Sequence, residues 1–131
     1  MNFFRSFLIV LFTTLFPSYL FGAILDSDTF DSDTDGWTIT NGGWDSGNQR
    51  IYIDRDDTAT KTFSFGASYA DATVSVTLDA TKTNTWEDSD LIQISANGTS
   101  VYNSNTAGSI AFNTTLNGSG QLTLVIMPNT N

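Results

Sequence analysis

The chain has 131 residues, and 14 Asp and Glu against 5 Lys and Arg give it a formal net charge of −9. It contains no Cys and no His, which excludes a disulfide scaffold, a thiol nucleophile, a zinc site and a Ser-His-Asp triad. The acidic balance argues against nucleic acid as a partner, because a negative surface repels the phosphate backbone.

Residues 1–22 are predicted to be a secretory signal peptide. Arg5 is their only charged residue, and an apolar stretch over 7–16 ends at Pro17. We expect cleavage after Gly22, which is small. The alternative is a membrane anchor, but a span needs about 20 predominantly apolar residues, and Thr, Pro and Ser interrupt this stretch. Cleavage leaves a single domain over 23–131, without a membrane span, and the loss of Arg5 takes its charge from −9 to −10.

The segment after the leader is predicted to be all-β, because its apolar residues recur at every second position. The clearest run is 73–80, in which Val74, Val76 and Leu78 share one face. Further strands are expected over 38–40, 50–53, 60–65, 91–96, 100–103, 109–113 and 121–127. The dipeptide Asn97-Gly98 predicts a tight hairpin turn. About eight short strands with turn residues between them indicate a two-sheet antiparallel β-sandwich, jelly-roll-like in its arrangement.

The segment 31–36 has the pattern of a calcium loop. It carries Asp31, Asp33 and Asp35 at alternate positions and then Gly36, and calcium is bound by several hard oxygen ligands around a turn. A helix-loop-helix site is excluded, because the twelfth position of the loop is Gly42 where that site needs Glu. A structural Ca²⁺ in a β-protein loop is one interpretation, with Asp26 and Asp28 in reserve. The other is a solvated turn, in which Asp and Ser are ordinary residues.

A second acidic cluster, 87–90, follows Trp86. A glycosidase needs two carboxyl groups on opposite sides of the scissile bond, and neighbours on one loop do not supply that arrangement. Glu87 is also the only Glu in the chain. We therefore expect no enzyme activity and assign Asp88 and Asp90 as further metal ligands, or as part of a solvated hairpin tip.

The candidate ligand site is the polar segment around Trp44. An exposed indole there can stack on the apolar face of a sugar, while Asp45, Asn48 and Gln49 bind its hydroxyl groups. The alternative is that Trp44 covers one open end of the sandwich. Phe63, Phe65 and most other aromatic residues are expected in the core.

The chain resembles a jelly-roll module of large bacterial secreted and cell-surface proteins. The resemblance covers roughly 26–126 and rests on segments 30–31, 36–37, 60–70, 86–90 and 94–98. It implies an adhesin- or toxin-repeat-associated module similar to carbohydrate-binding sandwiches, many of which carry a structural calcium. Such modules usually end with a strand whose Asp completes the ion site. No Asp follows Met127, so the domain is either compact as it stands or lacks a final strand that belongs to a longer protein.

Together these features predict a secreted or cell-surface bacterial module that is non-catalytic, stabilised by calcium, and binds a polysaccharide or a cell-surface glycan. The alternative is a purely structural spacer of a larger exported surface protein. Binding to glycans distinguishes the two, since a spacer has no ligand.

Overall fold

The computed structural model describes residues 2–11, 23–54, 57–82 and 90–129. A single 3-10 turn, η1 (Ala67–Tyr69), accompanies its strands. The strands are β1 (Asn2–Leu11), β2 (Ala23–Asp28), β3 (Thr38–Ile39), β4 (Gly43–Asp45), β5 (Arg50–Ile53), β6 (Ala59–Ser64), β7 (Thr73–Thr81), β8 (Leu91–Ala96), β9 (Thr99–Ser104), β10 (Gly108–Thr115) and β11 (Gln121–Asn129). Within the described ranges, no helix is long and apolar enough to cross a bilayer.

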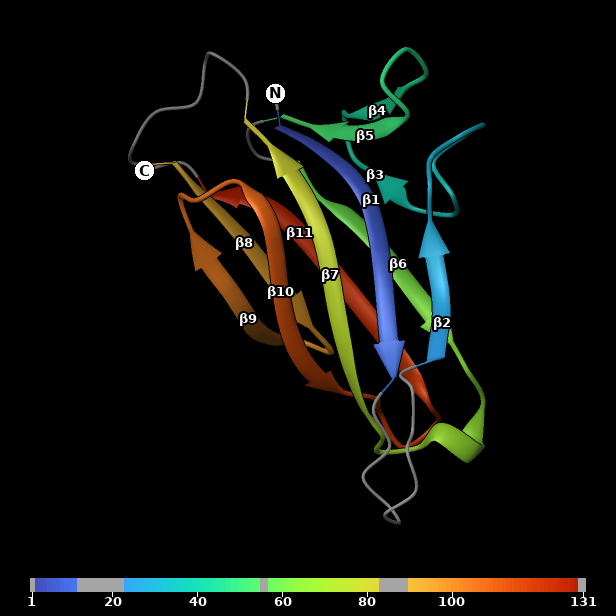
Figure 1. Ribbon diagram of the computed structural model, residues 1–131. Helices are drawn as coiled ribbons and strands as arrows, with labels where there is room; N and C mark the ends of the chain where they lie inside the picture. Colours follow the sequence, from blue (N-terminus) through green and yellow to red (C-terminus); the bar gives the residue numbers. More distant parts are fainter. Residues whose placement is uncertain (1, 12–22, 55–56, 83–89, 130–131) are drawn as a thin grey trace.

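The strands form two layers, which confirms the predicted antiparallel sandwich (Figure 1). The six-stranded sheet has the order β10-β7-β1-β5-β4, with β2 also paired to β1. The five-stranded sheet has the order β3-β6-β11-β8-β9. The sandwich has more strands than the eight that were expected, because β1, β2 and β4 lie in segments where no strand was predicted.

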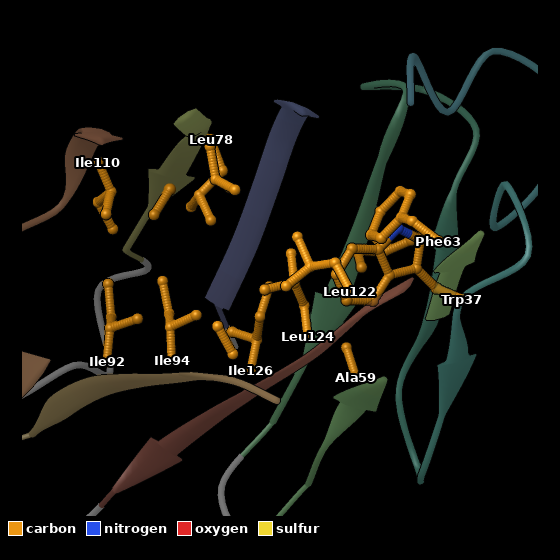
Figure 2. Packing of buried hydrophobic residues seen from close by; sticks show 14 of the residues in the cluster. Trp37, Ala59, Phe63, Leu78, Ile92, Ile94, Ile110, Leu122, Leu124 and Ile126 are labelled. Carbon is orange, nitrogen blue, oxygen red and sulfur yellow. The ribbon is translucent and has the colours of Figure 1, made fainter. Parts of the chain in front are cut away.

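Alternation of apolar and polar residues builds the core between the layers. In β7, Val74, Val76 and Leu78 are at most 2% exposed, whereas the residues between them face outward. The inward residues of β8, β11 and β10 meet them, as Figure 2 shows for Leu78 and Ile110 opposite Ile92 and Ile94. Each such side chain contributes about 1.5–3 kcal/mol when it is fully buried, so this alternation holds the two sheets together.

One end of the core is aromatic. Trp37 precedes β3 and lies edge-on to Phe63 of β6, with ring centroids 6.3 Å apart and planes at 78° (Figure 2). Phe65 lies nearly parallel to Phe63, with ring centroids 6.4 Å apart and planes at 6°. The predicted core positions of Phe63 and Phe65 are therefore confirmed, with Phe65 at the partly exposed margin, and Trp37 is buried beside them.

The predicted turn at Asn97 and Gly98 joins β8 to β9. Both residues have positive φ angles, 48° and 80°, as a primed two-residue turn requires. Asn97 also donates its side-chain amide to the carbonyl oxygen of Thr115 and accepts the N–H of Thr123. The turn is thus attached to the neighbouring ends of β10 and β11.

The last strand is longer than predicted. β11 pairs with β8 through Pro128 and Asn129, whereas the sequence indicated an end at Met127. Pro128 is buried, and a proline at the end of a strand costs only one ladder hydrogen bond.

The first described strand lies within the segment expected to be a leader. β1 pairs antiparallel with β7 along one edge, and its other edge is shared by β5 and β2. The signal peptide stays a prediction. A mature chain without residues 1–22 would lack this strand.

Candidate functional site

One buried polar cluster lies where β2 passes β6. Asp28 is 3% exposed; its Oδ2 accepts the indole N–H of Trp37 at 2.8 Å, and its Oδ1 forms an ion pair with the ammonium of Lys61. The same ammonium donates to the carbonyl oxygen of Asp35 at 2.6 Å and lies 4.7 Å from the ring centroid of Phe63. Lys61 therefore links the acidic segment after β2 to the core.

Burial sets the charge state of this cluster. Desolvation raises the pKa of Asp28 above its usual value, and its hydrogen bonds to Lys61 and Trp37 pull the pKa the other way. The carboxylate is costly to bury, and Lys61 offsets part of that cost.

The three carboxylates of the predicted calcium loop point to different partners. Asp31 accepts the hydroxyl of Thr29 at 2.9 Å, Asp33 accepts the N–H of Asp35 at 2.7 Å, and Asp35 accepts the N–H of Phe30. Among the residues that the structure describes, no three acidic side chains gather in a way that could hold a metal ion. Calcium binding stays a prediction.

The second acidic cluster is only partly within the described chain. Asp88, Glu87 and Trp86 lie outside the described residues. Asp90 immediately precedes β8 and is buried, with 4% of its surface exposed. The assignment of Asp88 and Asp90 as further metal ligands therefore stays a prediction.

The predicted sugar site lies on the hairpin of β4 and β5. The hairpin places Trp44 and Asp45 on opposite faces. Trp44 is paired with Ile51, a fully buried residue, and is half-buried on the core side of the hairpin. Its indole N–H donates to the carbonyl oxygen of Phe30 at 2.8 Å. Because successive residues of a strand point to opposite faces, Trp44 and Asp45 do not share one surface.

The polar members of that predicted site are held within the hairpin turn. Asp45 Oδ2 accepts Nδ2 of Asn48 at 2.8 Å and Nε of Arg50 at 3.0 Å. The bond from Asn48, followed by that from Arg50, lowers the pKa of Asp45 although partial desolvation opposes the shift. Gln49 is exposed and has a φ of 49°. The structure therefore brings Asp45 and Asn48 together as a turn.

A feature that the sequence reasoning missed is the outward face of the five-stranded sheet, which we call the uncharged face. Its side chains come from all five strands and are hydroxyl, amide or aliphatic groups. They are Thr38, Thr60, Thr62, Ser64, Leu91, Gln93, Ser95, Ser100, Asn103, Gln121, Thr123, Val125 and Met127. One row crosses the whole sheet, because the register aligns Thr38, Thr60, Val125, Ser95 and Ser100.

Hydrogen bonds between strands order part of this face. The hydroxyls of Thr62 and Thr123 are 2.8 Å apart, and Nε2 of Gln121 donates to the hydroxyl of Ser64 at 3.1 Å. Lys61 is the only charged residue in the five strands, and it faces inward to Asp28. The signal was present in the sequence as polar residues alternating with the predicted core residues of 60–64 and 121–127.

No protein-family model, curated protein or solved structure matches this chain, so the resemblance to a jelly-roll module of bacterial secreted proteins stays a prediction.

Proposed function

We propose that the chain is a non-catalytic binding module of an exported protein, and that its uncharged face binds a neutral polysaccharide. The observation that carries the proposal is the absence of charge from the thirteen residues of that face in a chain of net charge −9.

The chemistry of the face suits a polymer of hydroxyl groups. Ser and Thr hydroxyls donate and accept, and the amides of Gln93, Asn103 and Gln121 do both as well. Strand geometry repeats these groups about every 4.8 Å across the sheet and about every 6.8 Å along a strand. Val125 and Met127 add apolar surface for the C–H faces of sugar rings. A flat, repeated surface can make many weak contacts to an extended chain at once, which raises its overall affinity.

Charge elsewhere in the domain restricts the ligand to neutral polymers. The strands of the six-stranded sheet carry Asp26, Asp28, Asp45 and Asp79, and more Asp residues lie in the loops. A uronic acid or sulfated polysaccharide would be repelled by this field. A neutral glucan, xylan or chitin would not.

The hairpin of β4 and β5 is less suited to a sugar. Trp44 uses its indole N–H within the protein, and Asp45 lies on the opposite face of β4. The Asp45 carboxylate, which was expected to bind hydroxyls beside the indole, is thus directed away from it.

Depletion of the protein by insoluble polysaccharides tests the proposal. We expect the wild type to bind at least one of cellulose, chitin and insoluble xylan, and not alginate beads. The substitution Thr62→Lys places a charge in the middle of the face and should weaken binding about tenfold, or about 1.4 kcal/mol. Thr73→Lys is the matched control, because Thr73 is also an exposed strand residue paired with a Thr, but in the other sheet.

Equal loss of binding in both variants would contradict the assignment of the face. If the wild type binds none of the neutral polysaccharides, the proposed function is overturned and the spacer interpretation is favoured.

A further inference from the structure

The six-stranded sheet depends on β1 for its continuity. β1 is antiparallel to β7 from Phe3 to Leu11. On its other edge it pairs with β5 through Asn2–Phe4 and with β2 through Phe7–Leu11. Neither β5 nor β2 is hydrogen-bonded to β7 in the described sheet, so β1 alone joins the two halves (Figure 1).

The same ten residues belong to the segment that the sequence predicts to be removed on export. The predicted cut after Gly22 falls immediately before β2, which begins at Ala23. Removal of residues 1–22 would leave one edge of β7 without a partner and separate it from β5 and β2 by the width of one strand.

We propose that the exported domain has a strand-acceptor slot between β7 and the β5 and β2 edges, and that an extended segment of a partner protein fills it. The partner strand runs antiparallel to β7, as β1 does. The inference rests on the predicted cleavage and is independent of the polysaccharide proposal.

The register of β1 gives the chemistry of the partner strand. Val74, Val76, Leu78 and Ala80 are the inward, buried positions of β7. The residues aligned with them in β1 are Leu11, Ile9, Phe7 and Phe4. The partner strand therefore needs apolar residues at the positions that face the core. Arg5 is aligned with Asp79, an exposed residue of β7. A basic residue of the partner strand opposite Asp79 would therefore complement its charge. It would also complement the net charge of the exported chain, which falls from −9 to −10 when Arg5 is lost.

Without β1, the six-stranded sheet is expected to accept a new strand in the gap, because direct pairing of β7 with β5 and β2 is unfavourable. The N–H and C=O groups along the free edge of β7 would be unpaired beside a buried core, which costs free energy. The edges to be joined are two strand spacings apart, roughly 9–10 Å. Closing that distance would displace the β4–β5 hairpin, whose Trp44 is bonded to Phe30. A slot with an edge on both sides admits a single free strand, which favours a flexible segment of a partner over the paired edge of a second copy.

Export of the full-length chain from a bacterial host tests the slot. We expect the intact mass of the exported protein to lack residues 1–22. Hydrogen exchange of the β7 amides in that protein should be at least tenfold faster than exchange of the β11 amides. A synthetic peptide of residues 2–11 with a lysine tail should then slow the β7 exchange at least tenfold. The peptide with Ile9→Pro is the matched control and should give no protection, because proline cannot occupy a central strand.

If the exported domain is folded, four results would overturn the proposal. They are an exported protein that retains residues 1–22, β7 amides protected in the monomer without peptide, β7 amides protected by dimerisation of the chain, and equal protection by the proline peptide. An exported chain without β-sheet circular dichroism supports the slot if the residue 2–11 peptide restores the sheet, and overturns it if the peptide does not.

Discussion

Lys61 is the residue on which the acidic end of the sandwich depends. It is separated from Asp28 by 33 positions in the sequence, and the two side chains are 14% and 4% exposed. The pair was not predicted from the sequence, because it depends on how β2 and β6 are brought together in three dimensions.

The ion pair predicts that the effects of substituting Asp28 and Lys61 on the free energy of unfolding are strongly non-additive. Lys61→Met should lower the free energy of unfolding by about 3 kcal/mol, since it leaves Asp28 buried without its cation. Asp28→Asn combined with Lys61→Met should recover a large part of that loss, because no unpaired charge remains. Urea unfolding of the single and double variants measures the coupling, and additive losses would contradict the ion pair.

At the scale of elements, regular alternation was the reliable signal. β5 and β8 begin and end where the sequence predicted, and β7 and β11 lie within two residues of their predicted bounds. β4 was missed because Gly43, Trp44 and Asp45 show no alternation; they form a strand through their pairing with β5. The candidate ligand site in this segment stays a prediction, but the strand places Trp44 and Asp45 on opposite faces, which could not be predicted while the segment was taken for a loop.

The acidic segment after β2 gives a second prediction at this scale. Calcium held at 100 times its dissociation constant would add about 2.7 kcal/mol to stability, which corresponds to a rise of several degrees in melting temperature. The calcium site predicted from the sequence should give such a rise, whereas the present arrangement, in which Lys61 is paired with Asp28 and no three described acidic side chains gather, predicts less than about one degree of change. Differential scanning calorimetry with calcium and then with a chelator measures this. A rise of several degrees with calcium, reversed by the chelator, would show that the segment rearranges around the ion.

For the whole molecule, the two sheets have different surface chemistry. The strands of the six-stranded sheet carry Asp and Arg residues, whereas the outward face of the five-stranded sheet carries none. Sequence patterns identified the residues between the core positions as outward, but they did not show which strands lie side by side. The strand order β3-β6-β11-β8-β9 joins short polar sets from five separate segments into one face, and that order is set by long-range pairing.

NMR mapping of the bound ligand tests the central claim, that this face is the binding surface. The wild-type protein is labelled with nitrogen-15 and titrated with a soluble oligosaccharide of the polysaccharide that retains it. The account predicts that the largest amide shifts fall on β6, β11 and β8, near Thr62, Thr123 and Ser95. Shifts confined to the β4–β5 hairpin around Trp44 would contradict it.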